Sequence, residues 1–141
     1  MLKILLANDG SENSLRSVSY LIKRAASAKD QYQVALVNVQ YGLHGTVATF
    51  VNSTQIKQYH HDEGMKMLAS AATELSEAGI SYTHHLFVGE PAEVITRFAQ
   101  EQGCDEIVIG SRGLGNISSM LMGSVASKIV HMATMPVVLV K

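Results

Sequence analysis

The clearest indication of the fold is the stretch Ile107-Val108-Ile109-Gly110-Ser111-Arg112-Gly113, followed nine residues later by Gly123-Ser124-Val125. The run from Ile107 to Ile109 is typical of a buried strand, and the apolar residues after position 121 recur at helical spacing. A strand, a glycine-containing loop and a helix in this order can form a phosphate cradle. Glycine permits a turn at positive φ and a close approach by a ligand, and the helix start offers free N–H groups. The stretch therefore predicts a nucleotide site, with the Ser124 hydroxyl beside a phosphate oxygen.

Outward from this stretch, strand-like and helix-like segments alternate along the whole chain. We expect strands at 2–7, 33–39, 80–88, 105–109 and 136–140, and helices at 11–27, 54–78, 91–103 and from about 122. This alternation predicts parallel strands joined by right-handed crossovers, with helices on both faces of the sheet. The expected fold is α/β, a single domain over residues 1–141 with a doubly wound five-stranded parallel sheet in the order 3-2-1-4-5. Residues 40–55 lack a clear period, and connections this long are often functional.

In a sheet of this kind, ligands bind beyond the carboxyl ends of the strands, where the strand order reverses. The two turns richest in polar and glycine residues follow the first and fourth strands. With the first strand at the centre of the sheet, Asp9 and the Gly110–Ser124 loop would face one crevice.

Composition and charge exclude several classes of protein. Apolar residues make up 47% of the 141 residues and the formal net charge is −1, which is typical of a globular chain. No run of Lys or Arg indicates a nucleic-acid partner, and no apolar stretch approaches the roughly 20 residues of a membrane span. Cys104 is the only cysteine, and we expect a half-buried thiol in a reducing compartment. With no signal-peptide pattern at its start, the chain is expected to be cytoplasmic.

At this point the chain resembles the universal stress protein family over essentially its full length. The resemblance rests on Ile4-Leu5-Leu6-Ala7-Asn8-Asp9-Gly10-Ser11, on Gly89-Glu90-Pro91, and on residues 107–140 up to Pro136-Val137-Val138-Leu139-Val140. In that family the pattern Gly-x2-Gly-x9-Gly-Ser/Thr marks the ATP-binding members, and here it is complete. The resemblance implies an adenine nucleotide alpha-hydrolase-like fold. It also implies ATP, or ADP or AMP, with Mg²⁺ or Mn²⁺ on the phosphates, and a stress-response or regulatory role with little or no catalysis.

The resemblance also implies roles for individual residues. Asp9 would accept hydrogen bonds from the ribose, or contact a divalent ion already bound to the phosphates, since the protein alone offers no metal site. Ala7 and Asn8 would form a wall beside the nucleoside, and the backbone of Val39 would meet the adenine edge. The remaining residues come from the glycine loop and helix start: Gly110 under the ribose, Arg112 as added charge, and Gly113, Gly123, Ser124 and Val125 as donors to the phosphates.

Alternative functions in other classes lack their motifs. A nucleotide-dependent enzyme, such as a ligase, an alpha-hydrolase or a slow ATPase, is the main alternative. The ligases and hydrolases of related fold usually carry a Ser-Gly-Gly-x-Asp-Ser loop, which Asp9-Gly10-Ser11-Glu12-Asn13-Ser14 does not match. A receiver domain needs an aspartate after the third strand, where this chain has Phe87-Val88-Gly89, and a flavodoxin needs a hydroxyl-rich first loop. With no Walker lysine and no positioned base, we expect slow or absent ATP hydrolysis.

The last predicted strand, residues 136–140, indicates a homodimer. In the order 3-2-1-4-5 it lies at a sheet edge, and it is apolar on both faces with only Lys141 as a nearby charge. Exposed edge strands are templates for pairing, and a two-fold arrangement is the commonest oligomer symmetry. The family resemblance points to the same homodimer.

Overall fold

The computed structural model describes residues 1–42, 52–113 and 122–141. The predicted 40–55 connection and the predicted glycine loop therefore each lie partly outside the described residues. In chain order the elements are β1 (Leu2–Ala7), α1 (Glu12–Ser27), β2 (Tyr32–Gln40), α3 (Ser53–Glu77), β3 (Tyr82–Val88), α4 (Pro91–Glu101), β4 (Glu106–Gly110), α5 (Ser124–Met132) and β5 (Val137–Val140). All strand pairs are parallel, in the order β3-β2-β1-β4-β5. The predicted fold class and strand order are confirmed.

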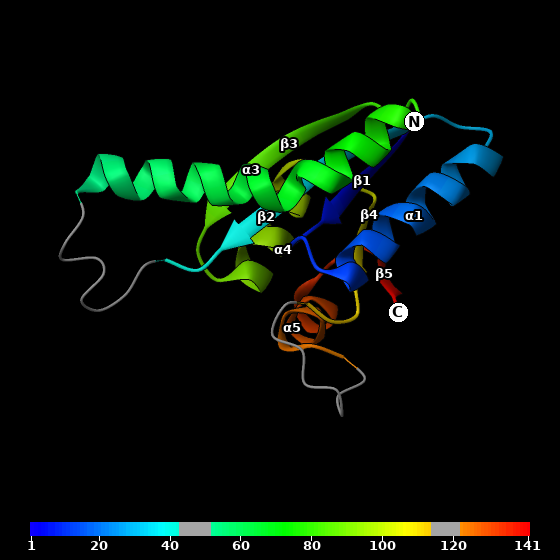
Figure 1. Ribbon diagram of the computed structural model, residues 1–141. Coiled ribbons are helices and arrows are strands. Elements are labelled where there is room, and N and C mark those ends of the chain that lie inside the picture. The colour runs from blue at the N-terminus through cyan, green and yellow to red at the C-terminus, as the bar shows by residue number, and fades with distance from the viewer. Residues whose placement is uncertain (43–51, 114–121) are drawn as a thin grey trace.

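Two helices cover each face of the sheet, with α1 and α3 on one face and α4 and α5 on the other (Figure 1). Alternate residues of each central strand face opposite layers. Leu5 and Ile107 pack with the α4 and α5 side chains, while Leu6 and Val108 pack with those of α1 and α3. Because both faces are covered, the central strands are apolar at nearly every position. None of the helices in the described part of the chain is long and apolar enough to cross a membrane.

Two of the helices end in the same hydrogen-bond motif, which explains one misplaced strand boundary. After α3, Gly79 has φ +72°, its N–H donates to Ser76 O, and the Ile80 N–H donates to Leu75 O. After α4, Gly103 has φ +65°, and its neighbour Cys104 makes the equivalent bond to Ala99 O. Ile80 therefore belongs to the end of α3, where its side chain packs on the core. The predicted start of the third strand at residue 80 was two residues too early.

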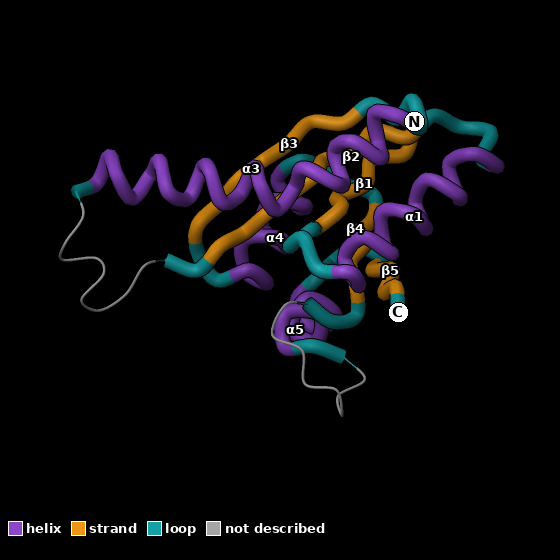
Figure 2. Tube along the Cα trace, in the orientation of Figure 1, coloured by secondary structure: helices purple, strands orange, loops and turns teal. Residues whose placement is uncertain are grey.

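The strand register places the carboxyl ends of β1 and β4 side by side. Ala7 lies opposite Val37 of β2, and Leu6 lies opposite Val108 of β4. The chain leaves β1 toward α1 on one face and leaves β4 toward α5 on the other, so the strand order reverses here. The first turns of α3 extend past the ends of β2 and β3 (Figure 2).

Candidate functional site

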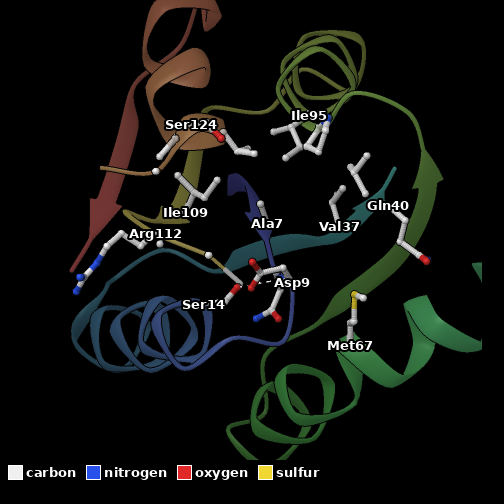
Figure 3. Close-up of a pocket in the computed structure, with 18 of the residues that line it drawn as sticks. Ala7, Asp9, Ser14, Val37, Gln40, Met67, Ile95, Ile109, Arg112 and Ser124 are labelled. Carbon is white, nitrogen blue, oxygen red and sulfur yellow. Dashed lines mark hydrogen bonds between the residues drawn. The ribbon is translucent and has the colours of Figure 1, made fainter. Parts of the chain in front are cut away.

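A pocket of about 470 Å³ opens at the carboxyl ends of β1, β2 and β4. All ten residues predicted from the sequence line it: Ala7, Asn8, Asp9, Val39, Gly110, Arg112, Gly113, Gly123, Ser124 and Val125. The structure therefore brings the first turn, the second strand and both ends of the glycine loop to one place (Figure 3). Whether each residue contacts a ligand stays a prediction.

Asp9 is held by the start of α1. The Ser11 N–H donates to Asp9 Oδ1 at 2.9 Å, and the Asp9 N–H donates to Ser14 Oγ at 3.1 Å. Figure 3 shows the Asp9 carboxylate beside Ser14, below Ala7. A Cβ added to Gly113 would overlap Asp9 Oδ2, so this oxygen lies against the loop that follows β4. Asp9 thus places a carboxylate between the β1 turn and that loop.

The three glycines of the motif do not owe their identity to positive φ, contrary to the sequence-based expectation. The positive-φ glycines in the described residues are Gly10, Gly79, Gly89 and Gly103. A Cβ at Gly110 would overlap Asn13 Oδ1, and one at Gly113 would overlap Asp9, so close approach of protein groups explains these two. A Cβ at Gly123 would lie 3.5 Å from Arg112 Cα, an ordinary contact. The protein's own packing therefore favours glycine at 110, where the Asn13 backbone also lies close, and at 113, where the overlap is with the end of the Asp9 side chain, but not at 123.

The start of α5 forms the polar end of the pocket. Gly123 is the N-cap residue and supplies no side-chain oxygen to the first turn of the helix. Its own N–H donates to Ser111 O at 2.6 Å, which fixes the helix start against the loop after β4. The uncapped N–H groups and the positive end of the helix dipole favour an anion at this point. Ser124 is exposed there, whereas Figure 3 shows the Arg112 guanidinium directed away from Asp9 and Ser124.

The other end of the pocket is mainly apolar and aromatic. Its lining comes from β2 and the residue after it, α3 and α4: Val37, Val39, Gln40, Tyr41, Tyr59, Met67, Pro91 and Ile95. Tyr41 and Tyr59 are 61% and 46% exposed, so both rings keep free surface for contact with a ligand. Met67 Sδ accepts a hydrogen bond from Asn38 Nδ2 at 3.2 Å. This end suits a flat ring with few charges, whereas the α5 end suits a negative group.

Most of the residues at the apolar end were missed by sequence reasoning. Tyr59 and Met67 lie on α3, and nothing in their spacing separates them from side chains that pack in the core. Pro91 was predicted only as a helix start, a role it has in α4. Ser14 could have been found from the sequence, because it lies one helical turn after the predicted N-cap Ser11, at the start of the helix that follows Asp9. In the structure the Ser14 N–H donates to Ser11 Oγ at 3.2 Å.

Asn8 has a larger structural role than the predicted wall. It is 4% exposed, its Oδ1 accepts the Gly10 N–H at 2.8 Å, and its carbonyl oxygen accepts Asn38 Nδ2 at 3.0 Å. These bonds fix the turn after β1 and join it to β2. Asn8 thereby holds the backbone of Asp9 in place.

Glu90, which directly precedes the lining residue Pro91, has a perturbed pKa. Burial alone would raise the pKa of the Glu90 carboxyl, but the Glu93 N–H and the charge of Lys128 lower that pKa below its ordinary value. The Lys128 Nζ is 3.4 Å from Glu90 Oε1, which joins α5 to the start of α4. Farther away, burial raises the pKa of the Cys104 thiol. Cys104 is 7% exposed and so more buried than expected from the sequence, which favours an inert thiol.

Comparison with known proteins identifies similar chains over this whole length. A model of the universal stress protein family matches residues 1–141. The universal stress protein YxiE of Bacillus subtilis is 29% identical, over 99% of this chain and 98% of its own length. The solved structure of MJ0577 from Methanocaldococcus jannaschii has a TM-score of 0.84 at 27% identity, covering 99% of this chain and 94% of that one.

A more distant structure shares the fold. A universal stress protein family protein from Arabidopsis thaliana, solved with AMP bound, has a TM-score of 0.73 at 20% identity. The match covers 100% of this chain and 92% of the other.

Proposed function

The chain belongs to the universal stress protein family, and we propose that it binds ATP, or the related ADP and AMP, in this pocket as a nucleotide-dependent regulatory protein. One observation carries the proposal: a carboxylate and an uncapped helix start converge on a pocket whose opposite end is apolar and aromatic. A nucleotide has the matching distribution of chemistry, with a flat base at one end and phosphates at the other. The complete glycine spacing adds to this support.

The phosphates would bind at the start of α5. Ser124 and Val125 offer backbone N–H groups and one hydroxyl to an anion, and the helix dipole adds to the attraction. The Gly123 N–H, predicted from the sequence as a further donor, already donates to Ser111 O. Gly113 faces the same space from the loop after β4. The base would lie toward Val39, Tyr59 and Met67, with the sugar near Asp9, since Asp9 lies between the two ends. Carboxylate oxygens are good acceptors for sugar hydroxyls.

The lining fits a divalent ion that arrives with the nucleotide. Asp9 is the only acidic residue among the described lining residues, and one carboxylate does not hold Mg²⁺ by itself. Mg²⁺ usually keeps several waters and binds through one or two carboxylates together with substrate phosphates. Asp9 would therefore contact a phosphate-bound Mg²⁺ or Mn²⁺ directly or through its water, and the ion would neutralise part of the phosphate charge.

The AMP-bound Arabidopsis structure supports an adenine nucleotide as the ligand, since a protein of the same fold holds one. Regulation is favoured over efficient catalysis because Asp9, the one carboxylate in the part of the lining that the structure describes, is held by Ser11 and lies against Gly113. A fast ATPase needs a group that orients and activates the attacking water.

Calorimetry with a capping variant tests the proposal. Gly123 has the extended backbone of an N-cap (φ −71°, ψ 167°), and its Cβ position is free of clashes. In Gly123→Asp, the new carboxylate would cap α5 and occupy the proposed phosphate position. We expect the free energy of unfolding to stay equal or rise by about 0.5 kcal/mol, while affinity for Mg-ATP falls at least tenfold. Gly123→Asn, a neutral cap of the same shape, should lose less affinity.

The outcomes separate the possible errors. Titration of the unmodified chain with ATP, ADP, AMP and GTP should show heat for the adenine nucleotides. If none of them binds at millimolar concentration, the proposed function is wrong. If Gly123→Asp binds ATP as tightly as the parent, the phosphates do not lie at α5.

A further inference from the structure

We infer that Asn13, which is not among the residues lining the pocket, is a positioning residue that links the proposed nucleotide site to the end of the C-terminal strand. The inference rests on the proposed function, because it concerns how that site is held and what its occupancy affects. Nucleotide binding does not itself require the buried Asn13 amide, and the inference assigns a role to this amide.

Asn13 makes two hydrogen bonds to two different elements. Its Oδ1 accepts the backbone N–H of Arg112 at 2.7 Å, and its Nδ2 donates to the carbonyl oxygen of Val140 at 3.2 Å. The Val140 oxygen also accepts the Ser111 N–H at 2.8 Å. One side chain of α1 thus joins the first residues of the loop after β4 to the last residue of β5.

The amide is held rigidly in this position. Asn13 is 6% exposed and is the second residue of α1, directly after the Ser11 cap and Glu12. Its Oδ1 lies so close to the backbone of Gly110 that no Cβ fits between them. An amide has one acceptor oxygen and a donor nitrogen in a single plane, so it alone among side chains of this size satisfies both partners.

This link has a consequence for the pocket. Arg112 and Gly113 line it, so the Asn13 bond sets the backbone position of one wall. The Nδ2 of the same amide is bonded to Val140 O, the last carbonyl oxygen of the edge strand β5. An event that fixes the backbone at Arg112 and Gly113 more tightly, such as phosphate binding, would then also act on the end of β5, and the effect must be reciprocal.

A comparison of three variants tests the link. Asn13→Leu has a similar volume and removes both bonds. Asn13→Asp keeps an acceptor for the Arg112 N–H but removes the donor to Val140, and a carboxylate in the first turn is favourable for the helix. Arg16→Gln is the matched control: Arg16 Nε donates to Lys141 O at 3.1 Å and so holds the same strand end, but no Arg16 contact to the loop is found in the described residues.

In the ligand-free protein, amide NMR and hydrogen exchange report the link directly. The Arg112 amide should exchange faster in Asn13→Leu but stay protected in Asn13→Asp, while the end of β5 loosens in both. With AMP added, the parent and Arg16→Gln should show increased protection at residues 138–141. Asn13→Leu should lose that increase and bind AMP about five- to tenfold more weakly, as expected for one lost hydrogen bond.

Two results would overturn the inference. One is an unchanged Arg112 amide and AMP affinity in Asn13→Leu, and the other is an equal loss of affinity in Arg16→Gln. If the unmodified chain binds no nucleotide, the proposed function fails instead. The amide signals of Arg112 and β5 in the ligand-free protein then still decide whether Asn13 joins the loop to the strand. If Asn13→Leu folds poorly, Asn13→Asp supplies the second measurement.

Discussion

At the residue scale, Gly113 and Gly123 illustrate how one motif combines two kinds of constraint. A Cβ at Gly113 would overlap the Asp9 carboxylate, so a side chain there would force Asp9 or the loop backbone to shift. A Cβ at Gly123 meets only ordinary contacts, so packing does not explain the glycine. The glycine at 123 is better explained by the proposed phosphate, because a side chain at this position would displace it.

Alanine substitutions distinguish these two constraints without any ligand. Gly113→Ala should lower the free energy of unfolding by about 1–3 kcal/mol, because Asp9 must move or the loop must shift. Gly123→Ala should change it by less than about 0.5 kcal/mol, because a poorer cap is offset by a less flexible unfolded chain. Urea denaturation of the nucleotide-free proteins measures both values, and equal losses would contradict the assignment.

The sequence predicted the site only in part, for reasons visible in single residues. Seven of the ten predicted lining residues lie within or close after strand ends, where topology brings them together, and the other three form the start of α5. Tyr59 and Met67 reach the pocket because α3 packs across β2. The rotation of α3 about its own axis cannot be predicted from the sequence, because the segment before the helix has no hydrophobic period. Asn13 was invisible because a polar residue in the first turn of a helix is ordinary until its two distant partners are known.

At the scale of elements, the edge strand β5 is the proposed dimer contact. The carbonyl oxygens of Pro136 and Val140 accept the N–H groups of Ile107 and Ser111 at 3.0 and 2.8 Å. Since backbone groups alternate along a strand, Val137 and Leu139 turn their N–H and C=O groups to the open edge. The side chains of Val138 and Val140 pack in the core under α1, so charges there would test folding rather than pairing.

Two proline variants separate pairing from folding. Leu139→Pro removes an N–H that faces the open edge, whereas Val138→Pro removes one that faces β4. If two copies pair through β5, sedimentation at micromolar concentration should show a dimer for the parent and a folded monomer for Leu139→Pro. Val138→Pro should lose much more stability, as judged by urea denaturation. A parent chain that sediments at its 15.2 kDa monomer mass would refute the dimer.

At the scale of the whole molecule, the reversal of strand order next to β1 explains why the pocket lies where it does. The sequence contained enough to predict this topology, because five apolar runs alternate with amphipathic segments and the polar turns follow the first and fourth strands. The start of the third strand was misplaced because the apolar Ile80 side chain packs on the core at the end of α3 and does not belong to the strand. Hydrophobicity alone does not distinguish that role from a strand.

The most direct test of the central claim is a crystal structure of the unmodified chain grown with Mg-ATP at a concentration that saturates it in calorimetry. We predict the base beside Val39 and Met67, the ribose at Asp9, and the phosphates within hydrogen-bond distance of Ser124 and Val125. Nucleotide bound elsewhere on the molecule, or phosphates turned away from the start of α5, would contradict the account.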